Sequence, residues 1–239
     1  MLVLILGCDS ENAWNCVQKV GDIQEFEFDF DETILRLEVY DDFSVVLHPS
    51  STQRVVVQTG KNLINEVEVA MPNDSTLLVC NHNNCNWTRR PDNMTLHFYT
   101  DQLEYFEKLN FGEVRTGGQL ALRNFEIVTK ASGNVTLDIT CEEQLFVKMF
   151  SLSNIKVTGT TPLFRVGIDP KIDGRLDALD LQTPRVSFYH SGTNDMMIRA
   201  SEAVSGSIRS FGDVHLYGDP PDVDVLDLGL GGRLLMMNP

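Results

Sequence analysis

The sequence predicts an all-β protein built as a β-solenoid, in which coils of about 20 residues stack on one another. Two observations predict this class: short stretches of alternating apolar and polar residues, and a turn motif that recurs through the second half. No long stretch has the apolar period of an amphipathic helix. The chain has 239 residues, of which 42% are hydrophobic and 22% charged, which is the composition of a folded protein. We assign residues 20–239 to a single solenoid domain.

The first half reads as a succession of strands. Within the expected strand at residues 23–30 (IQEFEFDF), residues 25–30 alternate between polar and apolar side chains, which is typical of a strand with one buried face. Turn residues such as Pro, Asn, Asp and Ser separate further expected strands over residues 34–40, 43–48, 54–58, 68–71, 76–80, 94–99 and 103–109. Residues 62–67 predict a short helical turn, because their apolar side chains have helical spacing.

The second half repeats a three-residue turn motif, in which a small or turn-favouring residue precedes a polar and then an apolar one. The motif begins, at intervals of 18 to 21 residues, at Gly112, Gly133, Ser153, Gly174, Asn194, Gly212 and Gly232. A short strand cannot bury its own apolar face, whereas stacked coils form a continuous core. We therefore predict an internal ladder made by Val114, Val135, Ile155, Leu176, Met196, Val214 and Leu234. The alternative is a β-sandwich, because two strand-and-turn units of 8–12 residues would also give a period of about 20.

The first eight residues resemble the end of a bacterial lipoprotein signal. An apolar run at residues 2–6 leads to Gly7 and Cys8, as in a lipobox, where the Cys thiol receives the lipid. Only seven residues precede Cys8 and none is basic, so we expect the leader to begin upstream of Met1. Residues 9–19 would then be a polar tether. The alternative is a first strand that carries a free Cys.

The remaining cysteines are Cys16, Cys80, Cys85 and Cys141, an even number that permits disulfides in an exported protein. Cys80 and Cys85 lie close in the sequence CNHNNC, and we predict that they are paired or remain free thiols. A metal site that also used His82 is disfavoured, because the spacing fits no common zinc pattern and a fourth ligand is lacking. We expect neither a metal nor a cofactor.

The end of the sequence carries a family resemblance. The run GDVHLYGDPP at residues 212–221, with GLGG at 229–232, is similar to the closing segment of the "putative auto-transporter adhesin, head GIN domain" family. The turns at residues 133–135 and 153–155 resemble its repeats, those at 174–176 and 194–196 depart from them, and the resemblance covers about residues 20–237. It implies a right-handed β-helix and a lipoprotein of the Gram-negative cell envelope, anchored in the outer membrane. It implies no established activity.

Charge and motifs narrow the function. A formal net charge of −15 argues against a nucleic-acid-binding protein and against charge-driven docking on anionic lipid. The sequence contains no nucleophile elbow, metalloprotease helix, phosphate-binding loop or dinucleotide fingerprint, and we assign no catalytic residue. The leading hypothesis is therefore a non-enzymatic adhesion or binding module, held to the membrane by its lipid anchor, for carbohydrate or another envelope component. A structural envelope scaffold is a further alternative.

The enzymatic alternative is a polysaccharide lyase or hydrolase that works on one face of the coils. The catalytic carboxylates of such an enzyme would come from the available aspartates, although their spacing singles out no pair: Asp138, Asp169, Asp173, Asp177 and Asp180. Arg165 and Arg185 are predicted to stack one above the other, where they could contact an anionic glycan. A separate acidic group, which could bind Ca²⁺ but is better explained as a solvated rim, comprises Asp219, Asp222, Asp224 and Asp227.

The C-terminal coil needs protection, because the end of a solenoid exposes unpaired strand edges. Only Asn238 and Pro239 follow the last apolar run, too few residues to form a capping helix. We predict that residues 219–227 form a loop that covers this coil, or that the coil is a contact surface. The opening half, with its charged strands and helical turn, is better suited to cap the first coil.

Overall fold

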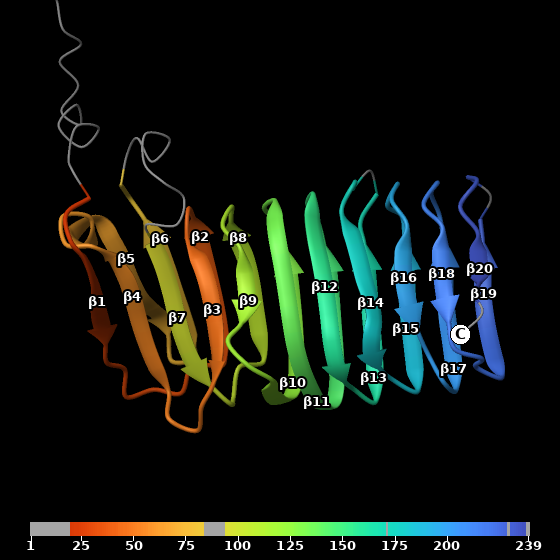
Figure 1. Ribbon diagram of the computed structural model, residues 1–239, viewed down its shortest axis with the longest axis horizontal. Helices are drawn as coiled ribbons and strands as arrows, with labels where there is room; N and C mark the ends of the chain where they lie inside the picture. Colours follow the sequence, from red (N-terminus) through yellow and green to blue (C-terminus); the bar gives the residue numbers. More distant parts are fainter. Residues whose placement is uncertain (1–19, 84–93, 171, 229, 238–239) are drawn as a thin grey trace, which may run out of the picture.

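The computed structural model describes residues 20–83, 94–170, 172–228 and 230–237. Within these ranges the chain forms twenty strands and one 3₁₀ turn (Figure 1). In chain order they are β1 (Ile23–Phe28), β2 (Arg36–Asp41), β3 (Ser44–Pro49), β4 (Arg54–Gly60), η1 (Ile64–Glu66), β5 (Val67–Asn73), β6 (Thr76–Asn81), β7 (Met94–Thr100), β8 (Tyr105–Asn110), β9 (Val114–Thr116), β10 (Leu120–Thr129), β11 (Gly133–Met149), β12 (Ser153–Thr160), β13 (Leu163–Ile168), β14 (Arg175–Gln182), β15 (Arg185–His190), β16 (Met196–Arg199), β17 (Ala203–Ile208), β18 (Val214–Tyr217), β19 (Asp222–Asp227) and β20 (Leu234–Met236). Among the described residues, no helix is long and apolar enough to cross a membrane.

The strands form two sheets that enclose one core, and the long strand β11 belongs to both. Sheet 1 has the order β1-β4-β7-β3-β9-β11-β12-β14-β16-β18-β20. Sheet 2 has the order β5-β6-β2-β8-β10-β11-β13-β15-β17-β19. From β8 onward each coil adds strand segments to both sheets, and all pairings there are parallel, which gives a β-solenoid of about six turns. The β-sandwich alternative is wrong, because its strands would pair antiparallel.

The predicted internal ladder is confirmed. Each apolar motif residue from Val114 to Leu234 is the register partner of the next one along the solenoid. The first six are at most 2% exposed, and Leu234 in the last coil is partly buried against them. The register also holds at the turns before Leu176 and Met196, although these turns depart from the family pattern. Burial of one aliphatic side chain per coil therefore fixes the stacking.

Close approach of the coils explains the glycines of the motif. A Cβ at Gly212 would lie 2.2 Å from the carbonyl oxygen of Asn194 in the preceding coil. Gly133 has a φ of +127°, which residues with a side chain rarely adopt. The small residue is thus required by backbone packing at the turn rather than by a ligand.

The opening half closes the first end of the solenoid. Strands β2 and β3 lie between the pair β6 and β7 on one side and the pair β8 and β9 on the other. Antiparallel strands β4 and β1 extend sheet 1 beyond β7, and β5 extends sheet 2 beyond β6. The helical turn expected at residues 62–67 is present as η1. This end is capped by antiparallel strands, as the sequence predicts.

The opposite end differs from the prediction. Residues 219–227 do not form a covering loop, because Asp222–Asp227 is strand β19 and pairs in register with all six residues of β17. Alternation of Val223 and Val225 with aspartates gives the segment a strand pattern, and Pro220 and Pro221 are confined to the turn before it. The second form of the prediction, that the last coil is a contact surface, remains a prediction.

The solenoid has two long edges, which we name by direction. The first edge contains the turns that lead from sheet 2 to sheet 1, after β8, β10, β11, β13, β15, β17 and β19. The second edge contains the turns that lead from sheet 1 to sheet 2, after β9, β12, β14, β16 and β18. In Figure 1 the first edge lies at the top and the second at the bottom.

A buried lysine lies beneath the first edge. Lys108 of β8 is fully buried, and its Nζ donates to the carbonyl oxygens of Asn110 at 2.5 Å, Ser132 at 2.6 Å and Ala131 at 3.3 Å. These carbonyls belong to two successive turns, so the ammonium group links neighbouring coils. Burial lowers the pKa of Lys108 from its ordinary value of 10.5 to about 8.

The lowered pKa predicts a pH dependence of stability. Between about pH 8 and pH 10 the unfolded chain binds a proton that folded Lys108 has lost, so the free energy of unfolding should rise with pH. The pKa difference limits the rise to about 3 kcal/mol. Urea unfolding over this range, compared with Lys108→Met, separates this effect from cysteine and tyrosine titration. An identical pH slope in the two proteins would contradict the assignment.

The core ladder predicts a large effect for a single truncation. Ile155→Ala should lower the free energy of unfolding by about 2–5 kcal/mol, because it removes buried apolar contacts and leaves a cavity between two coils. The neighbouring Lys156→Ala should change it by less than about 0.5 kcal/mol, since that side chain is half-exposed and its ion pair with Asp180 lies on the surface. Denaturant unfolding of both variants checks the ladder, and equal effects would argue against it.

Candidate functional site

Most of the cysteine predictions fall at the limits of the described residues. Cys8 and Cys85 lie outside them, so lipidation and the Cys80–Cys85 disulfide stay predictions. Cys80 is half-buried near the end of β6 and forms no disulfide with another cysteine among the described residues. His82, the ligand of the disfavoured metal site, lies 2.8 Å through its Nε2 from Oε2 of Glu68. Cys141 is buried in β11, where burial raises the pKa of its thiol to about 12.

The aspartates of the enzymatic alternative make local structural contacts. Asp138 accepts from the side chain of Gln119, Asp173 from the hydroxyl of Thr193, and Asp177 from the backbone N–H of Leu179. Asp180 pairs with Lys156, and Asp169 is exposed.

Two carboxylates outside that group, Glu27 and Glu143, have shifted pKa values. Hydrogen bonds from Arg54 lower the pKa of Glu27, and hydrogen bonds from Asn124 and Arg123 lower that of Glu143. A general acid at neutral pH would need the opposite shift.

Three ligand-type side chains meet at the first edge. Asp195, Asp213 and His215 bring one ligand atom each within 4.8 Å of the others. However, Asp195 accepts from the backbone N–H of Asp213 at 3.0 Å, and Asp213 from that of Arg233 at 2.7 Å. The two aspartates hold the middle position of the turn motif in successive coils, so their carboxylates link the coils. The sequence analysis did not bring them together, although the shared motif position was a sufficient signal.

The acidic residues near the C terminus are mostly solvated. Asp219 lies in the turn before β19, and Asp222, Asp224 and Asp227 lie on β19 itself. All four are exposed.

An aromatic row crosses sheet 1 near its capped end. The His48 ring stacks on the Tyr99 ring with centroids 4.3 Å apart. The guanidinium carbon of Arg54 lies over the same Tyr99 ring, 5.0 Å from its centroid. Nε2 of His48 lies 3.0 Å from Nδ1 of His97, and burial lowers the pKa of both imidazoles, so both are neutral at pH 7. Because the rings contact one another, this row serves packing of the sheet surface.

The outer face of sheet 2 carries a different cluster, which we call the basic aromatic patch. It comprises Phe146, Lys148, Arg165, Gly167, Tyr189 and Arg209. Parallel pairing places Arg165 opposite Phe146, and Gly167 between Lys148 and Tyr189. The patch therefore extends over β11, β13, β15 and the end of β17.

Cationic side chains lie against the aromatic rings of this patch. The Arg165 guanidinium carbon is 4.6 Å from the Phe146 centroid, and Nζ of Lys148 is 4.4 Å from it. Arg209 lies 5.2 Å from the Tyr189 centroid. Lys148 also pairs with Glu126 at 2.7 Å, whereas neither arginine forms an ion pair among the described residues. Two guanidinium groups are thus available to an anionic ligand.

Gly167 leaves open backbone at the centre of the patch. A Cβ there would come no closer than 3.8 Å to another residue, so the missing side chain leaves space above the strand. Tyr189, the next residue in the ladder, is 40% exposed. An exposed ring beside a flat stretch of backbone provides an apolar surface with polar surroundings.

One sequence prediction is wrong at this site. Arg165 lies opposite Ser187 rather than Arg185, which pairs with Leu163. The offset of two residues arises because β14 starts 21 residues after its partner in β12 and an irregularity within β14 increases this spacing to 22. Arg165 was therefore identified from the sequence, but its contact with Phe146 and the neighbouring contact of Arg209 with Tyr189 were not.

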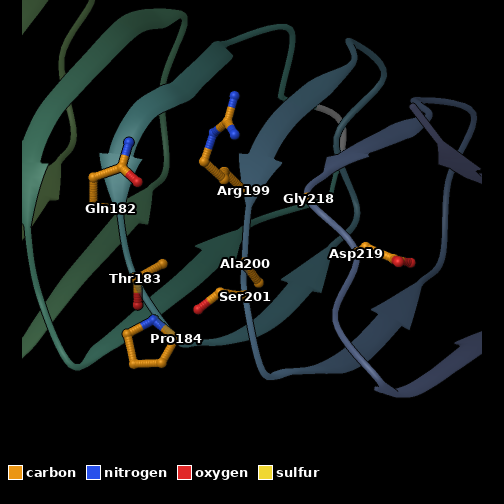
Figure 2. A pocket seen from close by; sticks show the side chains of 8 residues that line it. All are labelled: Gln182, Thr183, Pro184, Arg199, Ala200, Ser201, Gly218 and Asp219. Atoms are coloured by element: carbon orange, nitrogen blue, oxygen red, sulfur yellow. The ribbon is translucent and has the colours of Figure 1, made fainter. Parts of the chain in front are cut away.

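A separate hollow of about 340 Å³ lies at the second edge (Figure 2). It is lined by Gln182, Thr183, Pro184, Arg199, Ala200, Ser201, Gly218 and Asp219. Figure 2 shows Ser201 turned toward Thr183 and Pro184, and Asp219 turned away from them. Arg199 donates from Nε to the carbonyl of Leu179 at 2.9 Å, and Thr183 donates to the carbonyl of Arg185 at 3.0 Å. These bonds stabilise the turns, and no aromatic ring lines the hollow.

The stacked parallel coils define the class of protein as a β-solenoid. The chain belongs to the family described as "Putative auto-transporter adhesin, head GIN domain", whose model matches residues 35–220. This membership indicates an adhesion-like role and a location in the cell envelope or at the cell surface. No curated protein shows significant similarity to the chain.

Solved structures share the fold. A putative adhesin from Bacteroides fragilis is similar with a TM-score of 0.79 at 19% identity, over 91% of this chain and 97% of that one. A putative adhesin from Parabacteroides distasonis gives a TM-score of 0.61 at 13% identity, over 90% and 98%. A putative lipid binding protein from the same species gives 0.59 at 16% identity, over 90% and 98%. At these identities the likeness shows the fold alone.

Proposed function

We propose that this chain is a non-enzymatic, lipid-anchored adhesion module that binds an anionic carbohydrate through the basic aromatic patch. The observation that carries the proposal is the combination of two arginines, which form no ion pair among the described residues, with exposed aromatic surface on a flat sheet. Sugars offer C–H faces to aromatic rings and hydroxyl groups to polar side chains, and acidic sugars add carboxylates that suit guanidinium groups. The patch contains aromatic rings that can contact the faces of the sugars and guanidinium groups that can bind their carboxylates.

The charge distribution favours an anionic ligand at this place. The chain carries a formal net charge of −15, so repulsion opposes the approach of a polyanion to most of the surface. The patch concentrates Lys148, Arg165 and Arg209 over four neighbouring strands. A local positive area on an acidic protein directs a polyanion to one site, with an association rate that falls as salt is added.

Loss of a patch arginine should weaken glycan binding. Arg165→Ser should reduce affinity for polygalacturonate at least tenfold, equivalent to about 1.4 kcal/mol, because it removes a charge-assisted contact. Arg175→Ser removes an exposed arginine from sheet 1 and serves as the matched control. Binding is measured by calorimetry, with neutral dextran as the comparison glycan. Equal affinity of Arg165→Ser and Arg175→Ser would reject the patch.

The same assay separates the binding module from the enzymatic alternative. A polysaccharide lyase or hydrolase would shorten polygalacturonate and release new chain ends during incubation. We expect the polymer to be recovered at its original length. A scaffold without a ligand would show no binding in either protein.

The lipid anchor is tested separately. Expressed behind a lipoprotein leader, the protein should fractionate with membranes and carry the mass of an acylated cysteine, whereas Cys8→Ala should lack that mass and bind membranes more weakly. The expected mechanism is burial of acyl chains in the bilayer. Unchanged fractionation and mass after the substitution would show that Cys8 is not the anchor.

A further inference from the structure

We infer that the first edge of the solenoid lies against a lipid bilayer, with its exposed apolar side chains in contact with the membrane surface. The inference rests on the proposed lipid anchor for its orientation, but its evidence is the surface of the folded domain. Six exposed side chains form the contact, and we call them the apolar edge: Phe111, Phe150, Leu152, Phe211, Leu228 and Leu230.

These side chains are concentrated on one side of the molecule. Among the described residues, eleven large hydrophobic side chains are exposed, and the six of the apolar edge are all in turns of the first edge. Phe111 is 65% exposed and Phe211 is 67% exposed. Within the part of the chain that the structure describes, no large hydrophobic side chain is exposed in a turn of the second edge, which contains the polar hollow.

The register of the coils aligns these residues. Phe111, Leu152 and Phe211 each occupy the position immediately before the small residue of the turn motif. Coils are about 4.8 Å apart, so Phe111 and Leu152 are about 10 Å apart along the edge and Phe211 is about 14 Å further. A row of this kind is straight because the coils stack in register, and a straight row suits a planar surface.

The start of the described chain lies at the same edge. The first residue of β1, Ile23, is the register partner of Gly60, and the backbone N–H of Asn62 donates to the carbonyl of Val20 at 3.3 Å. Through β4, β7, β3 and β9, Gly60 is level with the turn that contains Phe111. Val20 thus lies at the first edge, near the capped end of the solenoid.

This position limits the distance between the domain and its predicted anchor. Eleven residues lie between Cys8 and Val20, and a segment of this length spans at most about 40 Å when fully extended. A lipid on Cys8 would therefore keep Val20 close to the bilayer, and the first edge with it. The second edge, about eight residues of strand away, would be roughly 25 Å further from the membrane.

The charges of the first edge indicate the type of lipid contact. Acidic side chains are in excess among the described residues of these turns, with Glu113, Asp169, Asp173, Asp195 and Asp213 mixed with Lys130, Arg209 and Arg233. Together with the net charge of −15, this mixture gives no attraction to anionic lipid. Contact should depend on apolar side chains that enter the interface, and it should be insensitive to salt.

Vesicle binding of the chain without its acyl group tests the edge independently of the anchor. The full chain with Cys8→Ala is mixed with excess phosphatidylcholine vesicles and separated by flotation. We expect measurable binding that added salt leaves unchanged, and at least a tenfold loss in Phe111→Ser/Phe211→Ser. Met236→Ser, which removes a side chain 53% exposed on the last strand, is the matched control and should bind like the parent.

A fluorescent reporter tests which side contacts the lipid. With Trp14 and Trp87 replaced by Phe, a tryptophan at position 211 should shift to shorter wavelength with vesicles and be quenched by brominated lipid. A tryptophan at position 236 should show neither change. Failure of the parent to bind vesicles, or equal responses at the two positions, would overturn the inference.

The outcomes separate this inference from the proposed function and from self-association. Loss of polygalacturonate binding in Arg165→Ser without loss of vesicle binding would show that the patch and the apolar edge bind their ligands independently. An unchanged protein mass after Cys8→Ala would refute the anchor but not the edge. Sedimentation as a dimer that Phe111→Ser/Phe211→Ser abolishes would show that a second copy covers the edge, and would overturn the membrane contact.

Discussion

The structure depends on the in-register stacking of successive coils. One apolar side chain from each turn motif lies directly on its counterpart in the next coil, from Val114 to Leu234. The aliphatic ladder and the parallel hydrogen bonds support each other, since a slip of one residue would turn every buried side chain outward. Everything on the surface, including the basic aromatic patch and the apolar edge, inherits its alignment from this internal constraint.

The same stacking explains why polar groups occur inside the molecule. At each turn the backbone changes direction and leaves carbonyl groups that the sheets do not pair. Lys108 donates to three of these carbonyls, and the hydroxyl of Ser153 donates to the carbonyl of Ala131 at 3.0 Å. A buried polar side chain at a turn is therefore a structural requirement, and it leaves the outer side of the turn free to vary. In this protein that freedom produces one apolar edge and one polar edge.

The two edges and the patch define an orientation of the domain relative to the membrane. The proposed membrane contact lies along the first edge and most of the patch lies on the outer face of sheet 2, with Arg209 where the two surfaces meet. A flat sheet held beside a bilayer would present its ligand site sideways, within reach of polymers in the envelope. Such an arrangement agrees with an adhesin-like family, in which the fold supplies a rigid surface.

The sequence by itself determined the all-β solenoid, its coil length, the helical turn near residue 64 and the members of the internal ladder. It could do so because buried positions must repeat with the coil, and repetition is visible in one dimension. It misjudged residues 222–227 as a loop, because aspartates obscured a short strand that only stacking on β17 reveals. Only the tertiary structure decided which outward side chains meet. The coil from Arg165 has 22 residues, which places Ser187 rather than Arg185 opposite it, and no burial requirement forces outward residues to repeat.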